Sequence, residues 1–193
     1  MSATSILTVD KAMVADHHSL IFQAWRCIIG DARVIYLSGP ITTGPRWLAA
    51  VNNEQMEFNG LINSNCQDLL DAAAKVRSDT SSIVIEPASL SVRGWSQDDY
   101  LSLWTELIER HAGEVRFLPG WEFSNGCARE FERAWRHAVP TRELDGTQIG
   151  LAEGLRQLRA SRDKIAAQLS QSPRLHGLHS ALAGVISRLE SVA

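Results

Sequence analysis

A glutamate follows a serine by six residues and a glycine by four, and this spacing could support nucleophilic chemistry. The apolar run 115–118 stops at Pro119-Gly120, and Ser124 then has the residue type that caps a helix. The free N–H groups of the first helical turn could hold an anion. Gly126 and Glu130 would share one helix face. A ligand could therefore approach the glycine closely and still touch the Glu130 carboxylate.

An earlier segment, residues 34–44, has the same design. It reads Val-Ile-Tyr-Leu-Ser-Gly-Pro-Ile-Thr-Thr-Gly, an apolar run followed by a loop of small residues. Ligands of open α/β sheets bind outside the carboxyl ends of the strands. This loop and the turn before Ser124 are therefore expected to line one cavity. Tyr36 lies within the apolar run and is expected in the core.

Together the two segments resemble the nucleoside 2-deoxyribosyltransferase-like superfamily. Ser38-Gly39-Pro40 matches the Gly-Pro loop that ends the first strand of its members. Ser124-Asn-Gly126-Cys-Ala-Arg-Glu130 matches their late Ser-x-Gly-x-x-x-Glu motif. The amino-acid sequence of both segments looks closest to a poorly characterised bacterial and phage branch of this superfamily, and the resemblance covers about residues 33–150. It implies that Glu130 attacks the sugar C1′ and forms a glycosyl-enzyme ester.

The resemblance also implies a set of ligand contacts. The Gly-Pro loop would line the base and sugar pocket, and the start of the later helix would cradle a sugar hydroxyl or a 5′-phosphate. Plain N-capping is the alternative role of Ser124. Trp121, Trp95 and Trp47 are placed to stack on a base, and Arg46 and Arg93 to bind a phosphate. The candidate substrate-binding residues are Ser38, Gly39, Pro40, Ile41, Asn65, Trp121, Ser124, Asn125 and Gly126.

The proton donor to the departing base is the point at which this chain departs from the superfamily pattern. Members usually carry an Asp in the helix before the third strand and another just before that strand, where this chain has Glu114. Spacing from the third strand favours Glu106 as the general acid. Asp99 is the competing choice, because it lies near the loop after the second strand. Acidic residues on a solvated helix face would look the same.

Composition bounds the cellular context. The 193 residues carry a net charge of −3 and three scattered cysteines, which fits a reducing cytoplasm better than a disulfide framework. No basic field favours nucleic acid, and no apolar stretch approaches the ~20 residues of a membrane span. We see no leader peptide, no zinc-binding spacing and no Gly-x-Gly-x-x-Gly or Walker sequence. The sequence predicts neither a metal nor a cofactor.

Alternating helices and strands predict an α/β fold: a Rossmann-like or flavodoxin-like, three-layer parallel sheet of four or five strands. Continuous apolar runs are typical of strands buried on both faces. The expected strands are residues 34–37, 83–86, 115–118 and a short one around Leu144. The expected helices are residues 16–29, 47–77 with a break near Asn59-Gly60, 97–111 closed by Gly113, and 124–138.

The last forty or so residues contain no strand pattern and read as a helical extension. We therefore divide the chain into a deoxyribosyltransferase-like domain, 1–150, and an extension, 151–193. Helices 151–169 and 175–192 carry broad apolar stripes that need a surface to cover them. A homodimer or larger assembly would supply it; the alternative is that both helices fold back over their own sheet.

Two functions fit the sequence. The first is an N-glycosidase or N-(deoxy)ribosyltransferase that acts on a nucleoside or nucleoside 5′-phosphate. The second is a non-catalytic nucleotide binder or sensor on the same scaffold, since a fold does not fix a function. A second carboxylate close to Glu130 favours the enzyme. A Glu130 that lies in a salt bridge, far from any cavity, favours the binder.

Overall fold

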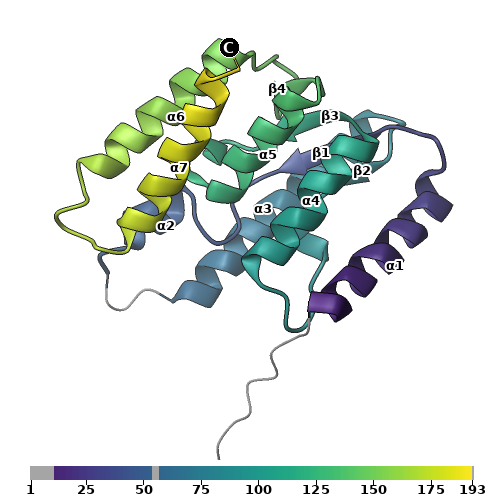
Figure 1. Ribbon diagram of the computed structural model, residues 1–193, viewed down its shortest axis with the longest axis horizontal. Helices are drawn as coiled ribbons and strands as arrows, with labels where there is room; N and C mark the ends of the chain where they lie inside the picture. Colours follow the sequence, from purple (N-terminus) through teal and green to yellow (C-terminus); the bar gives the residue numbers. More distant parts are fainter. Residues whose placement is uncertain (1–10, 54–56, 193) are drawn as a thin grey trace, which may run out of the picture.

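The computed structural model describes residues 11–53 and 57–192, and it confirms the predicted fold class. Four parallel strands form one sheet in the order β2-β1-β3-β4 (Figure 1). They are β1 (Val34–Ser38), β2 (Val84–Ile85), β3 (Ala112–Phe117) and β4 (Thr141–Glu143). The three runs expected to be neighbours are neighbours, with β1 in the centre. A parallel sheet of this kind carries its functional loops at the carboxyl ends of the strands.

The strands differ in length from the sequence-based expectation. All five residues of β1 are buried, as its unbroken apolar run predicts. By contrast, β2 is shorter than predicted, because Pro87 starts a 3₁₀ turn directly after Glu86. Strand β3 starts earlier, and Gly113 lies inside it rather than closing the preceding helix. A Cβ on Gly113 would lie 2.7 Å from that of Arg33, so only glycine allows this close approach.

Helices cover both faces of the sheet. One face carries α1 (Lys11–Ile29), α4 (Gln97–His111), α5 (Asn125–Arg136) and the C-terminal helices, which share one hydrophobic cluster with Tyr36, Val115 and Phe117. The other face is covered by α3 (Phe58–Asp79), which packs against Ile35 and Leu37. The single helix expected over residues 47–77 is two: α2 (Pro45–Ala50) and α3. The break thus lies before Phe58, not at Asn59-Gly60.

The sheet face on which α3 packs, which we call the α3 face, is covered unevenly for an electrostatic reason. On this face β3 and β4 carry charged side chains in place of apolar ones. One carboxylate oxygen of Glu114 binds Arg116, and the other accepts from Arg142 Nε at 2.8 Å. These groups stay partly solvated, so they need no helix above them. The apolar core on this face is correspondingly the smaller of the two.

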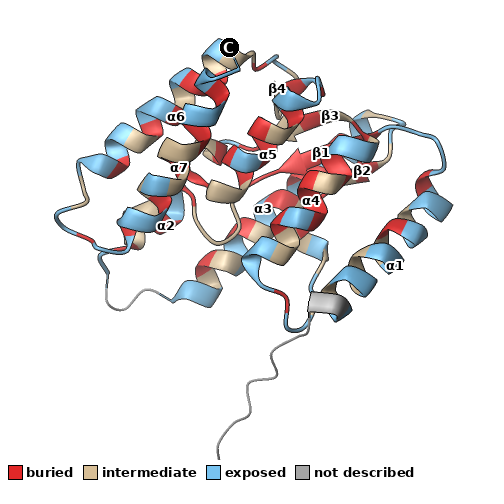
Figure 2. Ribbon diagram, viewed as in Figure 1, coloured by how far each residue is buried: buried red, intermediate tan, exposed pale blue. Residues whose placement is uncertain are grey.

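The C-terminal helices α6 (Leu151–Ala166) and α7 (Leu175–Glu190) fold back onto their own chain. Figure 2 shows their buried residues turned toward α5 and the sheet. The stripes on which the predicted assembly rested are therefore covered within one subunit, as in the alternative in which both helices fold back over their own chain. Within the described ranges, every helix is too short or too polar to cross a membrane. The buried stripe residues are Leu155, Leu158, Ile165, Leu178, Leu182, Val185, Ile186 and Leu189.

Candidate functional site

A sharp turn after β3 delivers the start of α5 to the carboxyl edge of the sheet. Gly120 makes this turn with a φ of 83°, which favours glycine. A Cβ there would also lie 2.4 Å from Pro45 of α2. Ser124 then caps α5, and its Oγ accepts from the Cys127 N–H at 3.5 Å. The predicted capping role of Ser124 is confirmed, and it sets the direction in which α5 presents Glu130.

Glu130 is the central group of the site. Its side chain is buried, at 5% exposure, and two hydroxyls from β1 hold its carboxylate. Tyr36 Oη donates to Oε1 at 2.8 Å, and Ser38 Oγ donates to Oε2 at 2.6 Å. In the described part of the chain, no cation lies within ion-pair distance of Glu130. A carboxylate that is buried without a cation keeps its reactivity as a nucleophile or a base.

Burial and hydrogen bonding act in opposite directions on this carboxyl. Burial raises the pKa of Glu130, and the hydrogen bonds from Ser38 and Tyr36 offset part of the rise. Burial and the adjacent Glu130 raise the pKa of Tyr36 well above its usual value, so Tyr36 remains a protonated donor. The same surroundings raise the pKa of Cys127 to about 12. That thiol is therefore neutral and cannot compete with Glu130 as the nucleophile.

A cavity of about 450 Å³ opens above Glu130, a volume within the range of small-molecule sites. The loop after β1, the loop after β2 and the first turns of α4 and α5 enclose it. The two segments that sequence reasoning paired therefore meet at one edge of the sheet. Six of the predicted residues line the cavity: Gly39, Ile41, Ser124, Asn125, Gly126 and Glu130.

The walls of this cavity are largely apolar and include flat rings. Trp104 and Tyr100 come from α4, and Pro87 comes from the turn after β2. Such walls suit the faces of a planar base. The Trp104 ring both packs on Tyr36, with a centroid distance of 5.9 Å, and lines the cavity.

Three of the predicted ligand contacts lie elsewhere. Pro40 and Asn65 line a different cavity, beside Arg46 on the α3 face. The Asn65 amide donates to the Ile41 carbonyl at 2.9 Å, so it supports the loop after β1. Trp121 is fully buried, because its ring packs between other aromatic rings of the core. Sequence reasoning placed it by its loop position, whereas its large apolar surface decides its location.

The other candidate residues also have structural partners. Trp95 is buried, with its ring 4.8 Å from His18 and 5.0 Å from Tyr100. Trp47 belongs to the same hydrophobic cluster. His18 is thus partly buried. Arg46, a predicted phosphate ligand, pairs with Asp68 at 2.5 Å.

The structure brings neither predicted general acid to the cavity. Glu106 forms an ion pair with Arg110 at 2.8 Å. Asp99 accepts from the Ser96 N–H at 2.7 Å, as the second half of a capping box. The carboxylate that does line the cavity with Glu130 is Asp98. The Ser-x-x-Asp pattern of a capping box could have assigned Asp99 to the cap and left Asp98 as the candidate.

Sequence reasoning missed the role of the Tyr36 hydroxyl in the site. Tyr36 was assigned to the core, and no local pattern distinguishes a core tyrosine from one that donates to a residue 94 positions away. No group of three His, Cys, Asp or Glu side chains in the described ranges could hold a metal ion.

The fold and the site define a class of protein: a Rossmann-like α/β domain with a buried, hydroxyl-bound carboxylate at the carboxyl edge of its sheet. Residues 33–140 match the model of a family described as Domain of unknown function (DUF4406). The match spans more than half of the chain, and the chain belongs to this family. The matched range includes the loop after β1, the turn before α5 and Glu130, and it ends before α6. No curated protein matches the chain, and no solved structure does.

Proposed function

We propose that the protein is an N-glycosidase or N-(deoxy)ribosyltransferase acting on nucleosides or nucleoside 5′-phosphates, as its resemblance to the nucleoside 2-deoxyribosyltransferase-like superfamily implies. One observation carries the proposal. The Glu130 carboxylate is buried without a cation at the wall of a ligand-sized cavity, and two hydroxyls fix both of its oxygens. Buried carboxylates are usually paired with a cation or a metal, and among the described residues this one has hydroxyl partners instead.

The reaction proceeds in two displacements. A Glu130 oxygen forms a bond to C1′ while the bond from C1′ to the base nitrogen breaks through an oxocarbenium-like state. The base leaves with its electron pair and takes up a proton. Water, or the nitrogen of a second base, then displaces the ester and returns the Glu130 carboxylate. Tyr36 and Ser38 keep the carboxylate in one orientation throughout.

Asp98 is our candidate for the proton donor to the departing base. Of the residues that line the cavity, it carries the carboxyl group other than Glu130. It lies in the first turn of α4, beside the apolar wall that we assign to the base. In this proposal Asp98 takes the place of Glu106, which spacing favoured, and of Asp99, which was the competing choice.

The ligand in this proposal is a free nucleoside or nucleotide, and not a nucleic acid. We place the activity in the cytoplasm, since Cys27, Cys66 and Cys127 are all free thiols and a reducing compartment maintains them. We also propose a homodimer or larger assembly, as the sequence indicated.

The test is release of free base. Wild-type protein is incubated with a panel of nucleosides and their 5′-phosphates, and free base is followed by chromatography. We expect release from at least one compound, loss of release in Glu130→Gln, and full release in Glu190→Gln, a surface control on α7 whose partner is Arg159. Equal release by wild type and Glu130→Gln would overturn the assignment of the nucleophile.

A non-catalytic nucleotide sensor is the second candidate, and one observation favours it. The Asp98 side chain is 91% exposed, whereas general acids with tuned pKa values are usually desolvated. Ligand binding by both wild type and Glu130→Gln, with no base released by either, would establish the sensor instead.

A further inference from the structure

A second cavity, of about 560 Å³, lies between α5 and α7 and is strongly basic. Three arginines of α5, at positions 129, 133 and 136, face it from successive turns, and Arg188 of α7 faces them. Glu132 is the one carboxylate among the lining residues. The cavity, which we call the arginine groove, therefore has three positive charges in excess, although the chain as a whole carries −3.

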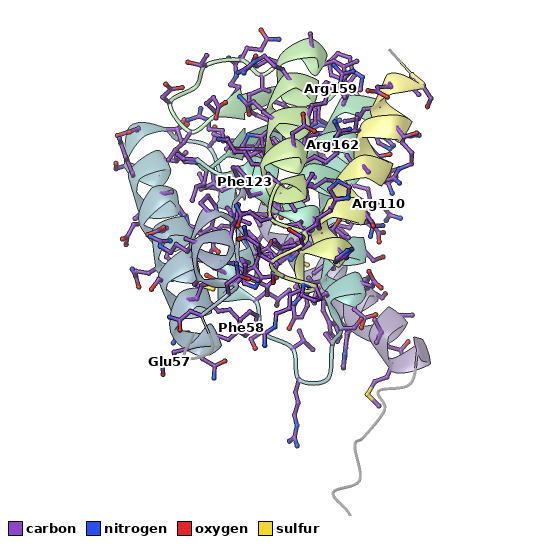
Figure 3. The ribbon with its side chains drawn as sticks, turned by 90° about the vertical axis from the view of Figure 1, so that its left-hand side faces the viewer. Glu57, Phe58, Arg110, Phe123, Arg159 and Arg162 are labelled. Carbon is purple, nitrogen blue, oxygen red and sulfur yellow. The ribbon has the colours of Figure 1, made fainter. Side chains whose placement is uncertain are left out.

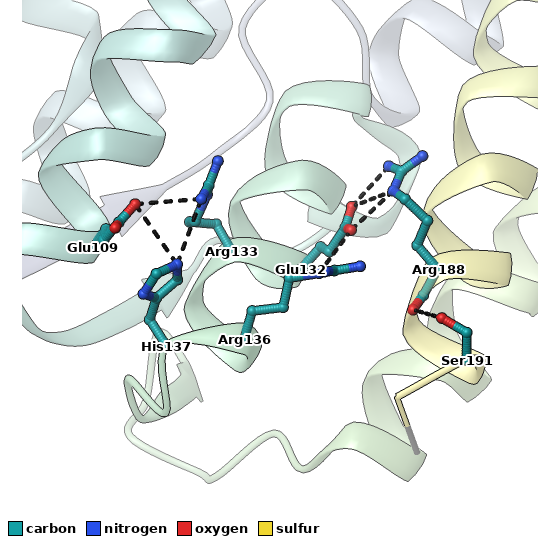
Figure 4. Close-up of polar contacts among 7 residues, drawn as sticks. All are labelled: Glu109, Glu132, Arg133, Arg136, His137, Arg188 and Ser191. Atoms are coloured by element: carbon teal, nitrogen blue, oxygen red, sulfur yellow. Dashed lines mark hydrogen bonds and ion pairs between the residues drawn. The ribbon is translucent and has the colours of Figure 1, made fainter.

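Glu132 holds two of these arginines in place (Figure 4). Arg188 donates to its carboxylate from Nε at 2.8 Å and from Nη2 at 2.7 Å, and Arg136 donates from Nε at 3.1 Å. A guanidinium carries five N–H donors, so both retain donors for a ligand. Arg133 is oriented from the other side by Glu109 at 3.3 Å. The groove is thus ordered before any ligand binds, which favours bidentate hydrogen bonds from the guanidinium groups to phosphate oxygens.

The arginine groove and the Glu130 cavity meet at the first turn of α5. Asn125 lines both cavities. Asp98, which lines the Glu130 cavity, lies 3.8 Å from Arg129, which lines the groove. One ligand could therefore occupy both by passing over Asn125.

The length of the groove indicates how many phosphates it would hold. Positions 129 and 136 are separated by about 10 Å along the helix, at 1.5 Å per residue. A chain of two or three phosphates matches arginines spread along that distance better than a single phosphate does. The arginines predicted from sequence as phosphate ligands, Arg46 and Arg93, line neither cavity.

We propose that the arginine groove is the phosphate subsite of the Glu130 cavity, and that the preferred ligand is a nucleoside with two or more 5′-phosphates. The inference rests on the proposed function for the placement of the sugar. The phosphate chain would extend from the sugar across Asn125, with its terminal groups on Arg133, Arg136 and Arg188.

The test uses the full chain and a probe that lacks a nucleoside. Binding of sodium tripolyphosphate is measured by calorimetry for wild type, Arg129→Gln, Arg133→Gln and the double variant. These two arginines are chosen because their side chains are 45% and 41% exposed, and neither one pairs with the buried Glu132. Arg162→Gln is the matched control, since Arg162 is a partly exposed arginine on α6 that pairs with its neighbour Asp163 (Figure 3).

We expect the double variant to weaken tripolyphosphate binding at least tenfold and the control to leave it unchanged. Added salt should weaken the wild-type interaction. In a second measurement ATP, GTP, CTP and UTP are compared with their nucleosides. At least one triphosphate should bind more tightly than its nucleoside and lose that advantage in the double variant, while nucleoside affinity stays the same.

The failures of the two proposals differ in these measurements. Tripolyphosphate binding that is absent, or equal in wild type and the double variant, overturns the phosphate subsite even if a nucleoside is hydrolysed. Tripolyphosphate that a nucleoside triphosphate cannot displace also overturns it, because the two cavities would then be separate. Absence of base release with arginine-dependent triphosphate binding overturns the proposed catalysis alone.

Discussion

Replacement of Tyr36 by phenylalanine tests the environment of Glu130 directly. The ring keeps its packing against Trp104, and the substitution removes the hydroxyl that donates to Oε1 at 2.8 Å. Because that bond favours the ionised carboxylate, its loss raises the pKa of Glu130 above the already raised wild-type value. A hydrogen bond to a charged group contributes about 1.5–3 kcal/mol. A loss of that size is large enough for a titration to resolve the rise.

The pKa can be measured without any assumption about activity. Protein labelled with ¹³C at the glutamate carboxyls is titrated by NMR, and the Glu130 resonance is assigned by its absence in Glu130→Gln. The chain offers a matched control in its other tyrosine, because the Tyr100 hydroxyl instead binds the Val92 backbone. Tyr100→Phe should leave the Glu130 pKa unchanged. A pKa that falls or stays constant in Tyr36→Phe would refute the reasoning, as would an equal rise in Tyr100→Phe.

Three further predictions concern stability and assembly. Burial raises the pKa of Glu130 in the folded state above its unfolded value, so ionised Glu130 destabilises the fold. This loss of folding free energy is absent below about pH 4.3, the usual pKa of a glutamate. It develops as the pH rises through the folded pKa. Glu130→Gln should therefore melt above wild type at pH 7.5, with the difference closing near pH 4, and equal melting temperatures at both pH values would contradict the desolvation argument. In Gly154→Ala, the new Cβ would lie 2.1 Å from the Phe131 ring, so urea unfolding should show that the free energy of unfolding falls by about 1–3 kcal/mol. The control is Gly177→Ala, where nothing lies within 4 Å of the new Cβ, and this variant should be as stable as wild type or more stable. Truncation after Ile149 should expose the core around Phe131 and give an aggregating or unfolded chain; a well-folded fragment in light scattering and circular dichroism would show that α6 and α7 are dispensable.

The parts of the fold that follow from local patterns were predictable. The unbroken apolar run indicated β1, the apolar residues Val115, Phe117 and Leu118 indicated β3, and the Ser124 cap with Pro119-Gly120 before it indicated the start of α5. The full strand order did not follow from these patterns. The two loops were related by the rule that open α/β sheets bind their ligands outside the carboxyl ends of the strands. That rule was enough to place Gly39 and Glu130 at one cavity before any coordinates existed.

Features that depend on contacts distant in the sequence were not predictable. The Tyr36 hydroxyl looked like part of a core residue, because its acceptor is 94 positions away. Trp121 looked like a ligand contact, because a loop position says nothing about the aromatic rings that surround it. The arginine groove requires α7 to pack against α5, and sequence patterning showed only that α7 needed some apolar surface.

Choices between neighbouring residues were also beyond pattern reasoning. Asp98 and Asp99 point about 100° apart on a helix, and the capping box that occupies Asp99 decides which of the two can reach the cavity. Similarly, the C-terminal stripes fit a dimer interface and an internal core equally well. Their burial against α5 and η2 (Trp121–Phe123) settles where the apolar surface goes.

The central claim is that Glu130 becomes covalently attached to the sugar during turnover. The most direct measurement is acid quenching of the protein with the compound that releases base fastest, followed by mass spectrometry of the proteolytic peptide that contains Glu130. We predict a pentosyl, or pentosyl phosphate, adduct on this peptide that maps to Glu130, disappears on a chase with water or a second base, and is absent from Glu130→Gln. Base release that persists in Glu130→Gln, or an adduct on another residue, would contradict the account.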